Sequence, residues 1–229
     1  MTDPELEAIE ARYARRAAIP ADRYSFASAD VRRGSTSADR AVLGALAAAG
    51  LADFPRLRVL EVGCGDGANL LRFLRWGVDP ARLVGNELLP DRLALARRVL
   101  PAEVVLVPGD ARTLQLEPFD VVLQSTVLSS ILDDDVQQGV AVAMWRLTRP
   151  GGAVLSYDFT VGNPRNPDVR AVPVSRLREL FPQGRLRARR VTLAPPLARR
   201  VASVGPVYSV LDAVPWLRTH AVVTVRQPG

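Results

Sequence analysis

A run of glycines and an acid after one apolar segment carries the most specific chemistry in the sequence. Residues 57–63 read LRVLEVG, and Glu61 precedes Gly63, Gly65 and Gly67 in a G-x-G-x-G spacing. Glycine lets a backbone approach a ligand closely. A dinucleotide site would instead show G-x-G-x-x-G and place a pyrophosphate there, which an acid would repel. Glu61 suits a ligand with an ammonium group or another positive centre.

Two further acids follow the next two apolar segments. Glu87 lies near the end of the segment 82–88, and Asp110 comes directly after the segment 103–109. A carboxylate at the first of these positions can accept both hydroxyls of a ribose. Asp110 can accept a hydrogen bond from an adenine amino group. Together with Glu61, these acids describe a site for an adenosine that has a cationic tail and no phosphate.

A doubly wound α/β sheet would bring these acids together, because such sheets bind ligands at the carboxyl ends of their strands. Runs of β-forming residues predict strands at 57–63, 82–88, 103–109, 119–126, 153–160, 187–194 and 220–227. Helical spacing predicts helices at 3–18, 38–50, 67–76, 89–100, 133–148 and 175–181, with a helical segment over 196–214 that breaks at Pro206. Ser37 is the expected N-cap of the second helix, and residues 19–36 are expected to be irregular.

Five sequence elements between residues 57 and 160 occur in the order of a known family. VLEVGCGDG, GNELLP, GDA, FDVVLQST and LTRPGGAVLSYDF resemble the motifs of class I S-adenosylmethionine-dependent methyltransferases. Segments outside this core, NPRNPDVRAV, LAPPLAR and VPWLRTH, resemble a bacterial subgroup of the type 11/25-like methyltransferase domain associated with glycan or secondary-metabolite pathways. The resemblance implies a Rossmann-like, seven-stranded sheet of order 3-2-1-4-5-7-6 with the last strand antiparallel and helices on both faces. Residues 1–36 would form an N-terminal helical extension or lid, and 37–229 a single methyltransferase domain.

The same resemblance implies S-adenosyl-L-methionine as cofactor, with S-adenosyl-L-homocysteine as product. The cofactor-binding residues that it implies are Glu61, Gly63, Cys64, Gly65, Gly67, Glu87, Leu88, Asp110, Ala111, Gln124 and Ser125. The glycine loop would line the methionine part and Glu61 would reach its amino end, while Glu87 would hold the ribose. Gln124 and Ser125 would lie beside the sulfonium. For Asp110 the alternative is a turn cap, and Cys64 is expected to be a small buried residue rather than a nucleophile.

Two residues are candidates for catalysis, and each has a plainer alternative. Asp158 ends the fifth strand and could orient or deprotonate an acceptor hydroxyl, or it could cap the following loop. His220 is the single histidine and could be a general base or a structural histidine. Acceptor-binding candidates are Tyr157, Arg165, Asn166 and Arg170. Tyr24 and Phe26 could belong to the lid or pack against the sheet.

The acceptor is expected to be a small molecule or a glycan, most simply methylated on a hydroxyl. The segment Gln124-Ser125-Thr126 lacks the Asn/Asp-Pro-Pro-aromatic signature of exocyclic base-amine methylation, and the sole cysteine lies in the glycine loop. N-methylation and an RNA- or protein-directed methyltransferase are the alternatives. A nicotinamide-dependent oxidoreductase and a binding protein without activity stay open as other classes.

Composition limits the remaining possibilities. The 229 residues carry a net charge of +6, with 30 basic residues that are all arginine, one cysteine and one histidine. These counts argue against a disulfide framework and a metal site. The arginines are scattered and are typical of a GC-rich bacterial genome, so nucleic acid is not the expected partner. No apolar run reaches the length of a membrane span, and MTDPELEAIEARYARR does not read as a signal peptide. We expect a cytoplasmic protein without a membrane partner, and a homodimer is an open possibility.

Overall fold

Seven strands form one mixed sheet in the computed structural model, which describes residues 4–16, 20, 23, 25–162 and 166–229. The strand order is β3-β2-β1-β4-β5-β7-β6. β7 is antiparallel to both of its neighbours, and the other adjacent pairs are parallel. The strands are β1 (Val59–Val62), β2 (Leu83–Glu87), β3 (Val105–Pro108), β4 (Phe119–Ser125), β5 (Thr148–Phe159), β6 (Arg185–Leu193) and β7 (Arg218–Arg226). The expected seven-stranded topology is confirmed.

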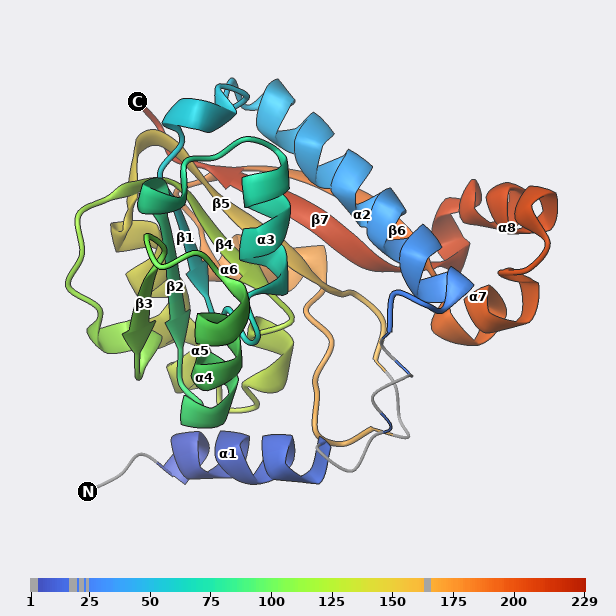
Figure 1. Ribbon diagram of the computed structural model, residues 1–229, viewed down its shortest axis with the longest axis horizontal. Helices are drawn as coiled ribbons and strands as arrows, with labels where there is room; N and C mark the ends of the chain where they lie inside the picture. The colour runs from blue at the N-terminus through green and yellow to red at the C-terminus, as the bar shows by residue number, and fades with distance from the viewer. Residues whose placement is uncertain (1–3, 17–19, 21–22, 24, 163–165) are drawn as a thin grey trace.

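Helices cover both faces of this sheet (Figure 1). They are α1 (Pro4–Arg16), α2 (Ala29–Ala48), α3 (Ala68–Arg75), α4 (Pro90–Val99), α5 (Asp134–Arg146), α6 (Val174–Leu180), α7 (Pro195–Val201) and α8 (Gly205–Asp212). Side chains of α2, α3 and α4 pack in one core cluster. Those of α1, α5 and α6 pack in the other cluster, on the opposite face.

The central strands are apolar because both of their faces are covered. All four residues of β1 are buried. Leu60 and Val62 join the cluster that contains α5, whereas Val59 joins the cluster that contains α2. Because side chains alternate along a strand, Glu61 points toward the layer of α2, α3 and α4. This placement puts a carboxylate inside a helix-covered face.

The start of α2 differs from the sequence expectation. The helix begins at Ala29 with Ser28 in the N-cap position, so the irregular structure expected for residues 29–36 and the N-cap expected at Ser37 are wrong. Residues 29–37 lack helical apolar spacing, but contacts far along the chain support them. A Cβ added at Gly34 would lie 3.6 Å from Thr192 Cγ2, and Arg33 Nε donates to the Ala202 carbonyl. The first half of α2 is therefore stabilised by packing on β6 and α7.

β5 also begins earlier than expected. It starts at Thr148, ahead of the strand predicted at 153–160, and includes the segment 149–152. The pairing with β4 shifts register between Phe119 and Val121, so the Pro-Gly-Gly sequence is accommodated by an irregularity within the strand pair.

The last helices form a lobe at the β6 edge of the sheet (Figure 1). The expected helical segment over 196–214 is two helices, and Pro206 lies in the first turn of α8, where proline is tolerated. Leu193, Ala198 and Tyr208 form a small apolar cluster beneath the lobe. Within the described ranges, no helix is both long and apolar enough to cross a membrane.

Candidate functional site

A cavity lies where β1, β2, β3 and β4 end, beneath α1. It contains about 740 Å³ of space free of atoms, part of it open to solvent. Figure 1 shows these strands running toward α1. Of the expected cofactor-binding residues, Gly63, Glu87, Leu88, Asp110, Ala111 and Ser125 line it. We call it the main cavity.

The glycine loop needs its glycines. Gly63, Gly65 and Gly67 have φ of 65°, 59° and 84°, which is the left-handed region that glycine favours. A Cβ at Gly63 would lie 2.4 Å from Val127 Cγ2. The loop therefore presents bare backbone to the main cavity and closes against the turn after β4. Gly65 and Gly67 do not line the cavity themselves.

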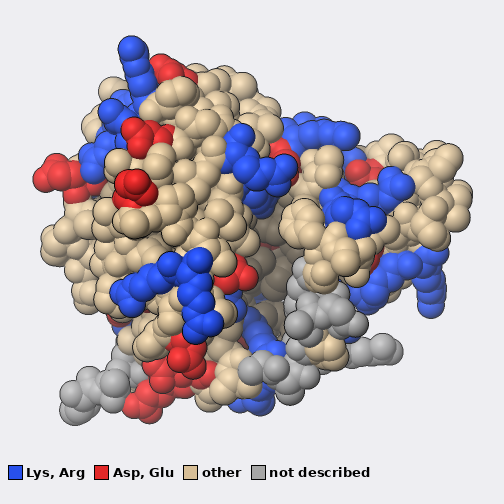
Figure 2. Space-filling view, in the orientation of Figure 1, with Lys and Arg blue, Asp and Glu red and all other residues tan. Residues whose placement is uncertain are grey.

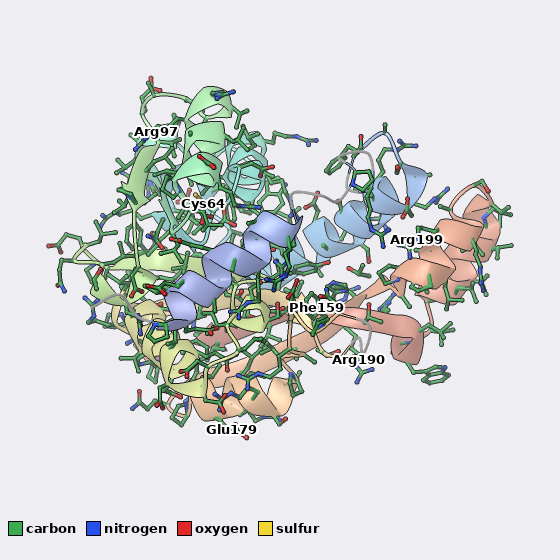
Figure 3. All side chains as sticks on the ribbon, turned by 90° about the horizontal axis from the view of Figure 1, so that it is seen from below. Cys64, Arg97, Phe159, Glu179, Arg190 and Arg199 are labelled. Atoms are coloured by element: carbon green, nitrogen blue, oxygen red, sulfur yellow. The ribbon has the colours of Figure 1, made fainter. Side chains whose placement is uncertain are left out.

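Cys64 is buried in this loop and is not on the cavity wall. Its amide donates to the Asn86 carbonyl over 2.8 Å, which ties the loop to β2. Burial raises the pKa of the thiol far above its usual range, and the carboxylates of Glu61 and Glu87 raise it further. A protonated thiol is a poor nucleophile. These features agree with the expectation of a small buried residue (Figure 3).

Glu87 lies on the cavity wall at the end of β2. Its Oε2 accepts from the Gly65 amide over 2.7 Å, and its Oε1 accepts from the Leu89 amide over 2.9 Å. Arg92 Nε lies 3.9 Å from Oε2. A carboxylate oxygen can accept more than one hydrogen bond, so Glu87 keeps capacity for ligand hydroxyls while its backbone partners hold it in place.

Asp110 lies on the wall after β3 and also caps a short helical turn. Its Oδ1 accepts from the Arg112 amide over 2.9 Å, and its Oδ2 accepts from Arg112 Nε over 2.8 Å. The turn-cap alternative is therefore present in the structure. A ligand amino group at Asp110 would share a carboxylate that Arg112 already neutralises.

Glu61 is fully buried and begins a chain of polar side chains on the other face of the sheet. Its Oε1 accepts from Asn69 Nδ2 over 2.6 Å, and Asn69 Oδ1 accepts from Arg72 Nη1 over 2.8 Å. Arg72 also pairs with Asp39 of α2. Burial raises the pKa of Glu61 to about 8, against the lowering effects of Asn69 and Arg72.

Two buried atoms in this group of polar side chains have no hydrogen-bond partner among the described residues: Glu61 Oε2 and Arg72 Nε. Buried polar atoms are normally satisfied, so these two are candidates for ligand contacts. Asn69 and Arg72 line a second, smaller cleft between α2, α3, β4 and β5. Ser125, at the end of β4, lines both this second cleft and the main cavity. An acid and an arginine with free hydrogen-bonding atoms suit the ammonium and carboxylate of an amino-acid tail.

Gln124, which was expected beside Ser125 at the sulfonium, instead organises the turn after β4. Its Oε1 accepts from the amides of Val127 and Leu128, and its Nε2 donates to Ser156 Oγ over 2.6 Å. The side chain is fully buried. The turn includes Thr126, a non-glycine residue with φ of 58°, and Thr126 lines the main cavity. Such strain persists only where surrounding contacts enforce it.

Asp158 belongs to the same buried group. Its Oδ2 accepts from Gln124 Nε2 over 3.3 Å and from the Ser129 amide over 3.2 Å. Burial raises its pKa to about 7. It lines neither cleft, so this geometry suits a residue that positions the turn after β4 more than one that touches an acceptor.

His220 and Tyr157 stack against each other beside the second cleft. Their ring centroids lie 5.1 Å apart at 15°, and the Tyr157 hydroxyl is 3.0 Å from Thr192 Oγ1. Burial lowers the pKa of His220 to about 4, so its ring is neutral at physiological pH and a weak base. Tyr157 lines the second cleft, whereas His220 does not.

The loop after β5 is tied to other elements. Arg170 Nη2 pairs with Asp134 Oδ1 over 2.7 Å, and Asn166 Oδ1 accepts from the Asp168 amide over 3.2 Å. Arg165 and Tyr24 lie outside the described residues. Phe26 is largely exposed, and the side chains that cover the main cavity come from α1 instead.

Sequence reasoning missed three residues that shape the site. Tyr13 of α1 lines the main cavity, and Arg92 of α4 does so as well. The Arg92 guanidinium lies 5.1 Å from the Tyr13 ring centroid. Arg72 holds the polar chain in the second cleft. The signal for Arg92 was its place in the first turn of the helix that follows Glu87, and the signal for Arg72 was its place in the helix that follows Glu61. The signal for Tyr13 was its helical spacing with Leu6 and Ile9.

The profile of a methyltransferase domain family matches residues 59–152. A search of curated protein sequences gave no match. Similar solved structures include the 1,6-didemethyltoxoflavin N1-methyltransferase of Burkholderia thailandensis, with TM-score 0.66 and 20% identity over 100% of this chain and 92% of that chain. The magnesium protoporphyrin IX methyltransferase of Synechocystis PCC 6803 gives TM-score 0.64 and 14% identity over 99% and 100% of the two chains. The (4+2)-cyclase SpnF gives TM-score 0.55 and 18% identity over 80% and 82%.

Proposed function

We propose that this chain, which contains a methyltransferase domain at residues 59–152, is an S-adenosylmethionine-dependent methyltransferase that acts on a small-molecule acceptor. The observation that carries the proposal is the pair of cavities that share Ser125 in their walls. One offers Glu87 and Asp110 to an adenosine. The other offers Asn69 and Arg72 to an amino-acid tail, with Glu61 buried behind Asn69. Two similar structures are titled as complexes with S-adenosylmethionine or S-adenosylhomocysteine.

The buried atoms support this cofactor over a dinucleotide. Glu61 Oε2 and Arg72 Nε lack partners, and an amino-acid zwitterion supplies one group of each required sign. A pyrophosphate would meet the Glu87 carboxylate near the glycine loop, which costs free energy by like-charge repulsion. In this assignment Glu87 holds ribose hydroxyls, and Asp110 and Ala111 flank the adenine.

When bound, S-adenosylmethionine supplies a methyl group activated by a positive sulfur; the acceptor atom takes the methyl group, and S-adenosylhomocysteine leaves with the sulfur electron pair. The protein's contribution is alignment, which can supply about 7–11 kcal/mol of a barrier in favourable cases. Gln124 and Asp158 hold the turn after β4, and α1 covers the main cavity with Leu6, Ile9 and Tyr13. We assign α1 as a lid that limits water, whereas residues 29–36 belong to α2 and pack on β6 and α7.

The acceptor atom is proposed to be a hydroxyl oxygen that is acidic enough to lose its proton without a strong protein base. The two candidate bases support this restriction, because Asp158 is committed to amide donors and the pKa of His220 is lowered to about 4. A phenol, an enol or a carboxylic acid meets the requirement. Transfer to an amine or ring nitrogen is the alternative within this class.

Incubation with methyl-labelled S-adenosylmethionine tests the proposal. The full chain would be offered phenols, carboxylic acids, alkyl alcohols and aromatic amines, with products read by mass spectrometry. We expect O-methylated phenols or acids. N-methylated products alone would replace the oxygen assignment, and a folded protein that binds the cofactor but methylates none of the panel would favour a binding protein. Asp158→Asn serves as a control for positioning, since it should lower the rate without changing the methylated atom.

A further inference from the structure

The positive charge of this protein is concentrated in its last part. Residues 181–229 contain eight arginines and one acid, Asp212, which gives a net charge of +7. The first 180 residues contain 22 arginines and 23 acids, which gives −1. The arginines look scattered along the sequence, yet the excess lies entirely in one quarter of the chain.

These arginines lie on the edge strand and on the lobe beside it. Arg185, Arg187, Arg189 and Arg190 are exposed on β6, and Arg199 and Arg200 are exposed at the end of α7. Figure 3 shows Arg199 on the side of the lobe, away from Arg97, and Arg190 nearer the middle of the molecule. Among the described residues none of these six has an ion-pair partner, since Asp212 pairs with Arg218. Their charge is available to a partner.

The same lobe also exposes large apolar side chains. Three valines are spaced three residues apart: Val204 lies just before α8, and Val207 and Val210 lie on it. Trp216 lies in the turn before β7. Trp216 is 78% exposed and Val210 is 67% exposed, which makes them the most exposed large apolar side chains in the described part of the chain. On the face seen in Figure 2, the upper right part of this lobe is tan, and blue arginine side chains lie on its inner and lower sides.

We propose that the lobe of residues 194–217, which we call the C-terminal lobe, docks this protein on an anionic membrane surface. Trp216, Val207 and Val210 would enter the interface between lipid headgroups and acyl chains, where tryptophan is enriched. The arginines of β6 and α7 would contact the anionic headgroups. A peripheral contact of this kind needs no spanning segment. It therefore differs from the expectation of no membrane partner, which rested on the lack of such a segment.

Charge and exposed apolar side chains together favour an anionic membrane over a second copy of the chain or a nucleic acid. A second copy of the chain would bring its own excess of +7 against the same surface and would be repelled. A nucleic acid would satisfy the arginines but would leave the valines and Trp216 without an apolar partner. An anionic bilayer meets both requirements at once.

Vesicle co-sedimentation of the full chain tests this inference. Vesicles of phosphatidylcholine alone would be compared with vesicles that also contain phosphatidylglycerol, at about 0.1 M salt. We expect binding to the anionic vesicles only. Because each basic residue near such a surface is worth about fivefold in affinity, the variant Arg199→Glu/Arg200→Glu should bind at least ~25-fold more weakly. Val207→Ser/Val210→Ser should bind about tenfold more weakly.

Two matched variants control for charge and apolar content elsewhere. Arg97→Glu/Arg98→Glu makes the same charge change on α4, and Val142→Ser removes an exposed valine of α5. Both should bind as the unchanged protein does. The inference is overturned if no vesicle binds, if the α4 variant loses as much affinity as the α7 variant, or if the α8 valines have no effect. It is also overturned if Val207→Ser/Val210→Ser instead dissociates a dimer in sedimentation, or if RNA binds where vesicles do not.

Discussion

Glu61 and Glu87 stand on adjacent strands but in opposite electrostatic situations. Glu87 accepts from two backbone amides and lies near Arg92, so its charge is stabilised by donors. Glu61 has one oxygen without a partner, and burial raises its pKa to about 8. The ligand-free protein therefore holds Glu61 mostly protonated at neutral pH. A cationic group close to Glu61 would favour its carboxylate form, and Asn69 links Glu61 to the wall of the second cleft.

The role of Glu87 predicts that its mutation weakens the binding of S-adenosylhomocysteine. Glu87→Gln keeps an acceptor for one amide but removes the negative charge toward ligand hydroxyls. A hydrogen bond to a charged group is worth about 2 kcal/mol, so affinity for S-adenosylhomocysteine should fall ~30-fold by calorimetry. Glu103→Gln, at an exposed acid before β3, is the control and should bind normally. Equal affinity of Glu87→Gln and the unchanged protein would remove Glu87 from the site.

The raised pKa of Glu61 predicts how stability depends on pH. Between pH 4.5, where the unfolded carboxyl ionises, and about 8, the folded protein keeps a proton that the unfolded chain has lost. Stability contributed by this proton is present at low pH and is lost as pH rises through that window, by up to about 1.4 kcal/mol per pH unit. The unchanged protein should therefore lose stability from pH 5 to 8 relative to Glu61→Gln. The free energy of unfolding of the variant minus that of the unchanged protein should rise over this range. Parallel pH curves would contradict the buried, protonated Glu61.

At the scale of elements, the loop between β1 and α3 depends on glycine for two separable reasons. Gly63 combines a positive φ with a Cβ position 2.4 Å from Val127 Cγ2, whereas Gly77 has φ of 95° and nothing within 4 Å. Gly77→Ala should cost only the backbone strain, about 1 kcal/mol. Gly63→Ala should cost at least ~1 kcal/mol more in denaturant unfolding and should abolish binding of S-adenosylhomocysteine. Equal losses of unfolding free energy in Gly63→Ala and Gly77→Ala would show that the turn after β4 moves aside without an energetic cost.

The helix α1 is held over the main cavity by buried polar contacts. Arg12 Nη2 lies 2.5 Å from Glu5 Oε1 and donates to the Ser130 carbonyl over 3.1 Å, and Glu5 accepts from the Leu132 amide. Arg12→Met keeps the aliphatic stem but removes these contacts. Amides of Pro4–Arg16 should then exchange hydrogen at least about tenfold faster, while those of β1 and β4 stay protected. The exposed Arg75→Met is the control, and unchanged exchange in α1 would contradict a helix held by Arg12.

Individual elements show where sequence patterns succeed and where they do not. The strands β1 and β4 were predictable because buried parallel strands are continuous apolar runs. The first half of α2 was not, since Arg33 and Gly34 are helical through contacts with α7 and β6, which lie about 160 residues further along the chain. Tertiary contact of this kind overrides local propensity.

At the scale of the whole molecule, the order of motifs predicted the topology and the edge at which the acids meet. Glu87 and Asp110 reach the main cavity as expected, because both follow strands that end at the same edge. The role of Asp158 was not predictable, since position at a strand end does not show which way a side chain points, and its oxygens face Gln124 and the Ser129 amide. The cover provided by α1 depends on long-range packing that no local pattern encodes.

The arrangement of charge is the other property of the whole molecule. The excess of +7 in residues 181–229 lies at the β6 edge, whereas the main cavity is at the carboxyl ends of β1 to β4. Binding of the cofactor and contact with an anionic surface therefore use separate parts of the protein, and variants of one should leave the other intact. The cofactor and the vesicle experiments can fail independently.

Isothermal titration of the full chain with S-adenosylhomocysteine, with NADH titrated in parallel, tests the central claim most directly. The pair of cavities that meet at Ser125 predicts one site per chain with micromolar affinity for S-adenosylhomocysteine and no heat from NADH. A folded protein that does not bind S-adenosylhomocysteine would contradict the methyltransferase proposal. Binding of NADH in its place would assign the glycine loop to a dinucleotide despite Glu61.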